Sequence, residues 1–233
     1  MKTVLKKSLV ILVLLPLFGL SQNQEQSERT VDSLYREDQL YFGVTYNLIS
    51  SKPEGLSQTG FSSGFHFGFI RDFPLNTKRN FAIGLGLGFS TNSINQNLQV
   101  QEDDAGGYNY ELISTDQFTK NKYTLNLIEL PLEFRWRSST YDTYKFWRVY
   151  AGFKVGYVIR SVVKYEGDPK DFKLKQIEDF NDFEYGLTLS AGYDKFNVHI
   201  YYGLNTVFDG NSSLDGQQID MSTVKIGLML YIL

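Results

Sequence analysis

Most charged side chains that could do chemistry in this 233-residue chain fall between apolar residues, at every second position of extended segments. They are Glu129, Glu133, Arg135, Arg137, Arg148, Lys154, Arg160 and Lys225. His66 and His199 have the same parity in two further segments. Because alternate side chains of a β-strand point to opposite faces, we expect all of these groups to share one face.

Such a charged face could serve three kinds of chemistry. The first is a structural network of ion pairs, with Glu129 and Glu133 between Arg135, Arg148 and Lys154. The second is a narrow anion-preferring path or a site for an acidic partner. The third is general acid–base or nucleophilic chemistry through the two histidines. Ser62 and the other Ser residues near them follow no motif, so we expect no catalytic residue.

Composition excludes several other classes of protein. The chain has no Cys, which removes disulfides, thiol nucleophiles, zinc–thiolate sites and lipid attachment at Cys. It has 2 His, which disfavours His-rich metal sites, so we expect neither a metal nor a cofactor. The net charge of −3 gives no sign of nucleic-acid binding. The mean hydropathy of −0.26 excludes a bundle of several membrane helices.

Residues 1–21 have the pattern of a secretory signal peptide. Lys2, Lys6 and Lys7 are followed by the apolar stretch Ser8–Leu20, and small residues precede a cut after Ser21. The alternative is a membrane anchor, but the stretch is short for a span of about 20 residues. Residues 22–39 are polar with mixed charges, and we expect a periplasmic lead-in there.

From residue 40 to 233 the apolar residues recur with a period of two, which predicts β-strands. The segments are Tyr41–Ser50, Phe61–Arg71, Phe81–Ser90, Leu125–Arg137, Phe146–Ser161, Glu184–Tyr193, Phe196–Leu204 and Thr223–Leu233. A soluble β-sandwich and a membrane barrel both alternate in this way. Gly-rich inner positions, aromatic residues near strand ends, and connections that alternate between long and short favour the barrel. The sequence therefore predicts an all-β, eight-stranded antiparallel barrel of the outer-membrane type.

Three local expectations follow from this architecture. Side chains just fill an eight-stranded barrel, so inward charges must pair or meet water. Pro131 lies inside a strand and cannot donate to the sheet, which predicts a bulge or a local break there. Residues 92–122 are polar and acidic, so we expect a solvated surface loop, or alternatively a loop that binds a cation or a partner.

Three stretches carry a resemblance to a known family. The runs 127–140 (LIELPLEFRWRSST) and 144–154 (YKFWRVYAGFK), with 201–205 (YYGLN), resemble the PorT-like outer-membrane barrels of Bacteroidetes, in particular the PorT/SprT branch. The resemblance extends over nearly all of the chain after residue 21. It implies an outer-membrane barrel required for type IX protein secretion and gliding motility. No catalytic residue is implied.

The expected function is therefore that of a non-enzymatic accessory or assembly component of type IX secretion. A generic porin-like or structural barrel without a secretion role is the alternative. Expected partners are outer-membrane lipid and other secretion components, with no nucleic acid and no small-molecule cofactor. Ser138, Ser139, Thr140 and Lys145 form the candidate periplasmic partner rim.

Overall fold

A computed structural model describes residues 38–103, 106–138, 146–210 and 212–232. The expected signal peptide and nearly all of the expected lead-in lie outside the described residues. Within the described ranges every regular element is a β-strand. None of these residues forms a helix that is long and apolar enough to cross a membrane.

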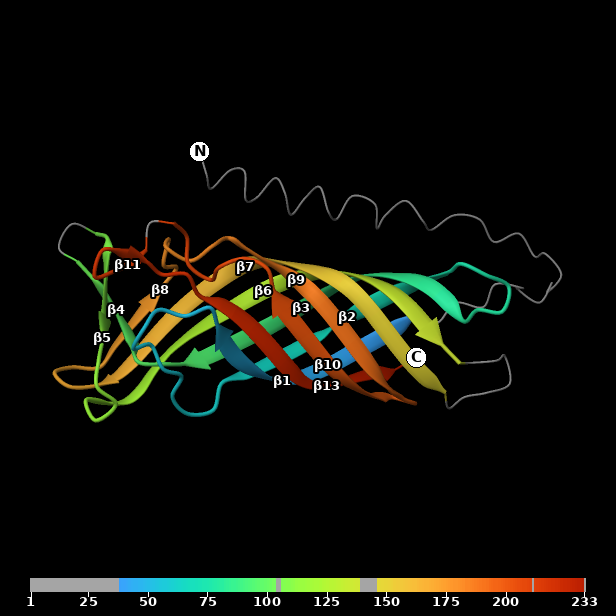
Figure 1. The fold of residues 1–233 in the computed structure, drawn as a ribbon, viewed down its shortest axis with the longest axis horizontal. Helices are drawn as coiled ribbons and strands as arrows, with labels where there is room; N and C mark the ends of the chain where they lie inside the picture. The colour runs from blue at the N-terminus through green and yellow to red at the C-terminus, as the bar shows by residue number, and fades with distance from the viewer. Residues whose placement is uncertain (1–37, 104–105, 139–145, 211, 233) are drawn as a thin grey trace, which may run out of the picture. The chain divides into compact units, whose positions relative to one another are not determined.

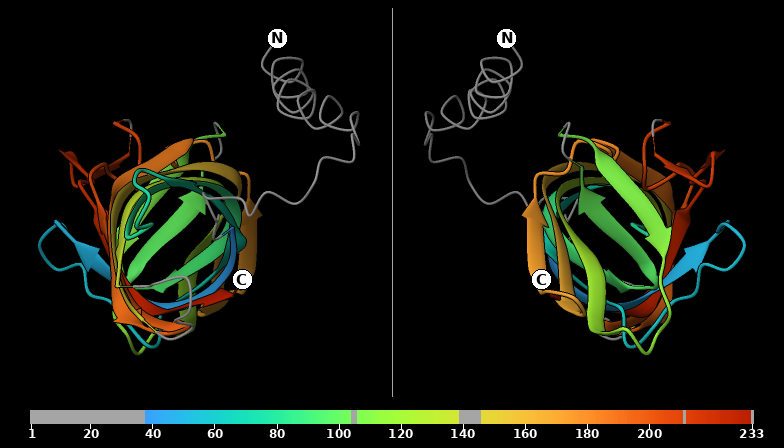
Figure 2. Two further views of the ribbon diagram at one scale, coloured as in Figure 1. Left: turned by 90° about the vertical axis from the view of Figure 1, so that its right-hand side faces the viewer. Right: turned by 90° about the vertical axis from the view of Figure 1, so that its left-hand side faces the viewer.

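Eight strands form a closed antiparallel barrel. They are β1 (Gln39–Ser50), β2 (Ser63–Pro74), β3 (Phe81–Asn95), β6 (Phe118–Arg137), β7 (Trp147–Gly167), β9 (Phe183–Tyr193), β10 (Phe196–Gly203) and β13 (Ser222–Ile232). Neighbours pair in the order β6-β3-β2-β1-β13-β10-β9-β7, and pairing of β6 with β7 closes the ring (Figure 2). The predicted eight-stranded barrel is thus confirmed.

The outer face of the barrel is apolar, and this explains why the strands alternate. In β1, Leu40, Phe42 and Val44 are 50, 47 and 51 % exposed, whereas Tyr41 and Thr45 are buried. The same alternation recurs around the ring, so the large apolar side chains face outward and the small or polar ones inward. A water-soluble sandwich would have the opposite arrangement, whereas a barrel in lipid requires this one.

Two pairs of aromatic residues mark the ends of this apolar band. Trp147 of β7 contacts Tyr193 with ring centroids 5.4 Å apart, and Tyr157 contacts Phe183 at 5.3 Å. Trp147 and Tyr157 are ten positions apart on β7. At about 3.3 Å per residue and a tilt of about 40°, this corresponds to roughly 25 Å, the usual height of the lipid-facing band.

Five short strands gather at the end of the barrel that carries the long connections (left in Figure 1). They are β4 (Leu98–Glu102), β5 (Tyr108–Leu112), β8 (Phe172–Lys175), β11 (Ser213–Leu214) and β12 (Gln217–Gln218). β4 pairs with β5, β11 with β12, and β8 extends the edge of β7. The expected solvated loop at 92–122 is wrong, because β3, the β4–β5 hairpin and β6 occupy most of it.

The irregularity of the barrel does not lie at Pro131, where a bulge or break was expected. The β3–β6 register is the same on both sides of Pro131, although the two pairs nearest to it are absent. A register shift occurs instead where Asn126 pairs with Arg160 and Leu127 with Val158. This bulge reverses the parity of β7. Arg160 is consequently exposed on the outer face, and its expected place in the lumen is wrong.

Two glycines make room for a tyrosine that fills the lumen. Gly68 pairs with Gly88 across β2 and β3, and the ring of Tyr41 lies over both. A Cβ atom added at Gly68 would lie 2.6 Å from Tyr41 Cε1 and 2.6 Å from the carbonyl oxygen of Leu87. The second contact is with backbone, so moving the tyrosine alone cannot relieve it.

We predict that Gly68→Ala destabilises the folded barrel by about 1–3 kcal/mol, the usual cost of overpacking a filled interior. Urea unfolding of the protein in lipid vesicles, followed by tryptophan fluorescence, measures the change. Gly210→Ala is the matched control, because its added Cβ meets only the end of Gln218 at 3.5 Å. Equal midpoints for the two variants would contradict the close packing of Tyr41.

Candidate functional site

The lumen holds the charged residues that the sequence predicted to face inward, with one exception. Those placed inside are at most 6 % exposed: Glu129, Glu133, Arg135, Arg137, Arg148, Lys154 and Lys225. His66 and His199 are buried beside them. Arg160, on the outer face, is the exception. Because burial of a charge is costly unless it is paired, the partners of each group decide what this interior can do.

Glu129 is the centre of the first cluster. Its carboxylate lies 3.1 Å from Lys154 Nζ and accepts a hydrogen bond of 2.7 Å from the Ser90 hydroxyl. His66 Nδ1 is 3.5 Å away. These groups come from β2, β3, β6 and β7, so the cluster ties one wall of the barrel together across its interior.

A second ion pair lies beside the first and shares an aromatic neighbour with it. Lys225 of β13 pairs with Glu184 of β9. The ammonium groups of Lys154 and Lys225 lie 5.0 and 4.6 Å from the ring centre of Tyr201. Tyr201 therefore stands between two cations, and its ring face favours both of them.

The second cluster is built on Asp72. Arg135 donates a hydrogen bond of 3.0 Å to one of its oxygens, and Arg137 forms an ion pair of 2.9 Å with the other. Arg135 also donates to Glu133 at 2.9 Å. The Arg135 guanidinium lies 4.5 Å from the ring centre of Tyr150. Asp72 thus forms ion pairs with two arginines that are neighbours on the inward face of β6.

Two of these acids were missed in the sequence. Asp72 follows directly on the segment Phe61–Arg71, so a boundary that ended one residue too soon hid it. Glu184 is the first residue of its predicted segment. Its parity places it on the inward face, but nothing in the sequence indicated a basic partner for it. With both included, the inward charges in the described lumen are four carboxylates and five bases.

Arg148 differs from the other inward bases. It is 2 % exposed, and its guanidinium lies 4.4 Å from the ring centre of Phe146. Within the described ranges, no carboxylate lies at ion-pair distance from it. It therefore does not join Glu129 and Glu133, as the predicted network required, and it lies near the short-turn end of the barrel.

The first histidine occupies a position that resembles a hydrolase triad. Thr45 Oγ1 lies 3.1 Å from His66 Nε2, and Glu129 lies on the other side of the ring. However, the Thr45 hydroxyl donates its proton to Asn47 at 2.8 Å, so Nε2 of His66 must be the donor toward Thr45. A general base needs the opposite arrangement. Thr45, His66 and Glu129 are also at most 3 % exposed.

The second histidine, His199, is also hydrogen-bonded to a hydroxyl group of a neighbouring strand. His199 Nδ1 lies 2.7 Å from the Ser190 hydroxyl, which is also 3.4 Å from the Tyr231 hydroxyl. Ser190 and His199 face each other across β9 and β10. In the described part of the chain, no group of three or more His, Asp or Glu side chains could hold a metal ion.

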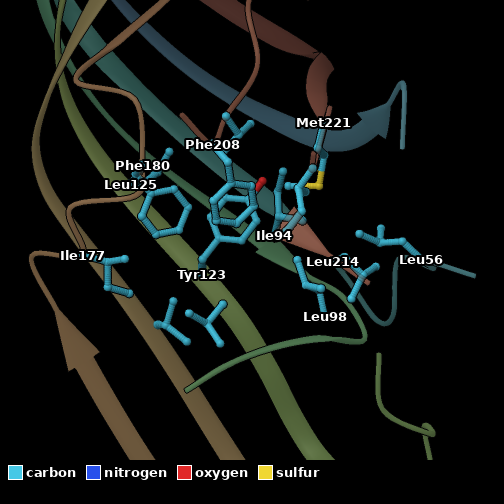
Figure 3. Packing of buried hydrophobic residues seen from close by; sticks show 14 of the residues in the cluster. Leu56, Ile94, Leu98, Tyr123, Leu125, Ile177, Phe180, Phe208, Leu214 and Met221 are labelled. Carbon is cyan, nitrogen blue, oxygen red and sulfur yellow. The ribbon is translucent and has the colours of Figure 1, made fainter. Parts of the chain in front are cut away.

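An apolar cluster, here called the apolar cap, occupies the long-connection end of the barrel (Figure 3). Tyr123 of β6 contacts Phe180 and Phe208 with ring centroids 5.4 and 6.3 Å apart, and Phe180 stacks on Phe208 at 4.8 Å. Leu56 and Leu98 come from two further connections. All four long connections therefore contribute buried side chains to the apolar cap, so these connections pack against one another.

The predicted periplasmic rim lies almost wholly outside the described residues. Ser139, Thr140 and Lys145 belong to the undescribed segment. Ser138 is exposed at the end of β6, and its hydroxyl accepts a hydrogen bond of 3.0 Å from the backbone N–H of Trp147. Ser138 thus ties the end of β6 to the start of β7.

We predict that Glu129→Gln destabilises the barrel by about 3–5 kcal/mol, because it leaves the Lys154 charge buried without its partner. The double variant Glu129→Gln/Lys154→Met should recover part of this loss. Urea unfolding in vesicles measures both. Glu166→Gln is the control, since it removes a half-buried surface partner whose ion pairs contribute little. A single variant as stable as the wild type would show that the lumen is hydrated.

A comparison with known protein families agrees with this architecture. Residues 21–209 match the family described as outer membrane protein beta-barrel domain. No curated protein matches the chain. Among solved structures, a similar one is Ail, the attachment invasion locus protein of Yersinia pestis, with 11 % identity and a TM-score of 0.33 over 85 % of this chain and 100 % of that one. Since the family match spans most of the chain, this protein belongs to the outer membrane protein beta-barrel domain family.

Proposed function

We propose that this outer-membrane barrel is a non-enzymatic accessory or assembly component of the type IX secretion machinery, with a role in gliding motility where that occurs. The observation that carries the accessory role is the filled lumen. Ion pairs occupy its middle and the apolar cap occupies one end. An eight-stranded barrel is too narrow to pass a folded protein even when it is empty. The protein therefore acts through its surfaces.

The link to type IX secretion rests on the sequence runs 127–140, 144–154 and 201–205, which resemble the PorT/SprT branch. In this proposal residues 1–21 are a signal peptide, and residues 22–39 lead from the periplasm into β1. Because long loops of outer-membrane barrels face outward, the short turns face the periplasm. Other secretion components would then meet the rim formed by Ser138, Ser139, Thr140 and Lys145.

The non-enzymatic part of the proposal is supported by the hydrogen bonds of the two histidines. His66 is a donor toward Thr45, and His199 is held between β9 and β10 by Ser190. Neither ring lies in an exposed position. These contacts favour a structural role for both residues.

We predict that a strain lacking this protein retains type IX cargo inside the cell, and that the wild-type copy restores export. Immunoblots of cargo in periplasmic and culture-medium fractions measure the distribution. Normal export in the deletion strain would refute the proposed function.

Two complementing variants can locate the contact surface. Changing Ser139, Thr140 and Lys145 to Glu alters the proposed rim and should block export. The matched control changes Ser213, Gln217 and Gln218 to Glu, since these exposed residues lie on the β11–β12 hairpin at the opposite end. Heat-modifiable gel mobility verifies that each barrel is folded. Loss of export only in the control would place the contact on the long-loop side.

A porin-like barrel is the alternative function, and the filled lumen stands against it. We predict that the purified protein in planar bilayers gives no steady conductance steps above background. Glu129→Leu/Lys154→Leu removes one ion pair from the lumen and should also give no conductance steps, because the apolar cap remains. Regular single-channel steps in the wild type would favour the porin-like function.

A further inference from the structure

Basic side chains gather on the outer face of one wall of the barrel, formed by β6, β7 and β8. The strand registers place Lys122, Lys164 and Lys173 side by side in one row. In the next row toward the barrel middle, Lys175 is opposite Val162, and one row further Arg160 is opposite Asn126. Adjacent rows on one face are about 6.6 Å apart along a strand. We call Lys122, Arg160, Lys164, Lys173 and Lys175 the basic wall.

The basic wall begins where the lipid-facing band ends. Along β7, the outward Ile159 is 40 % exposed, and the bulge then turns Arg160 outward directly after it. The aromatic pair of Tyr157 and Phe183 lies just below. Arg160 is therefore roughly 6 Å beyond the aromatic girdle, at about 3.3 Å per residue on a tilted strand. The polar headgroup layer is about 5–8 Å deep on each side of the hydrocarbon core.

Few acidic groups neutralise this surface. Glu166 pairs with Lys120 at 2.8 Å and also with Lys164. Hydrogen bonds from these two lysines lower the pKa of Glu166 to about 2. Among the residues that the structure describes, Lys122, Arg160, Lys173 and Lys175 have no carboxylate at ion-pair distance. Three of these four side chains are exposed, and Lys122 is half-buried.

The rest of the long-connection end has the opposite charge. The connections 176–182 and 204–221 together carry six acidic residues and no Lys or Arg. The whole chain has a net charge of −3. The basic wall is thus a local departure from an acidic background, and it is confined to the wall where the bulge exposes Arg160.

We propose that the basic wall binds the phosphate-bearing headgroups of outer-leaflet lipids. Its surface continues the lipid-facing band without a break, so its neighbour at that depth is a headgroup. Lys supplies a compact point charge and Arg a two-pronged donor, and both bind phosphate oxygens. The long side chains can also lie along acyl chains while their charged ends reach the headgroups. The long-loop end faces outward in this class of barrel, which assigns the outer leaflet.

The test is a competition between two lipids that differ only in the headgroup. The full mature chain, folded in a neutral detergent, is mixed with equal amounts of phosphatidic acid and phosphatidylcholine that have identical acyl chains. Native mass spectrometry then counts the bound molecules of each. We expect phosphatidic acid to be retained in excess. In Arg160→Gln/Lys173→Gln/Lys175→Gln this excess should fall by about fivefold or more, since each basic residue near an anionic surface is worth about a factor of five.

Two further variants make the result specific to this wall. Lys52→Gln/Lys78→Gln/Lys195→Gln removes the same charge from exposed residues elsewhere and should keep the excess. Glu166→Gln frees Lys120 and Lys164 and should increase it, which tests the proposal even if the triple variant fails to fold. Addition of inorganic phosphate should leave the bound lipid in place. Equal retention of both lipids by the wild type would overturn the proposal, as would equal losses in the two triple variants.

Discussion

The pairing of charges inside a lumen with no spare room is the constraint on which this structure depends. Eight strands enclose just enough space for side chains, so buried bases need partners there. Four of the five in the described lumen pair with a carboxylate from another strand, and Arg148, over the Phe146 ring, is the exception. Asp72 of β2 meets Arg135 and Arg137 of β6 past the intervening β3, and Glu129 meets Lys154 on the neighbouring β7. These pairs also fix the register. A slip of one residue would turn them into lipid, where each Arg or Lys at the midplane costs about 2–4 kcal/mol.

The same constraint explains why the barrel is irregular where it is. Below the bulge, β6 and β7 present charged residues to the lumen and apolar residues to lipid. Above it, Ser161 and Val163 face inward, and Val163 joins the apolar cap. Without the bulge Arg160 would enter the cap, where no carboxylate of the described cluster could meet it. One extra residue in β7 thus separates an ionic interior from an apolar one, and it moves a positive charge to the membrane surface.

Period-two alternation was sufficient to predict the eight barrel strands and the inward place of most charges, because lipid on one side and a narrow lumen on the other leave little freedom. Counting alternate residues fails beyond a bulge, because the bulge shifts the inward and outward positions by one. No residue type in β7 marks the bulge, so Arg160 was assigned to the wrong face. Pairing partners are set by register between distant strands, which hid the role of Asp72. The apolar cap was missed because Leu98, Phe180 and Phe208 lie in connections without a period, where burial depends on other loops.

A barrel that is closed inside has three surfaces left with which to act: the short turns, the long-connection end and the lipid-facing wall. The long-connection end is held by the apolar cap, so its loops present a packed surface rather than flexible chains. The outer wall is uniform in its apolar band, and at the long-connection end its cluster of basic residues lies on β6, β7 and β8. This asymmetry gives the barrel a preferred orientation toward charged headgroups, and with it a defined side to present to a neighbour in the membrane. In the proposed accessory role, this defined side is the surface that a neighbouring secretion component would meet.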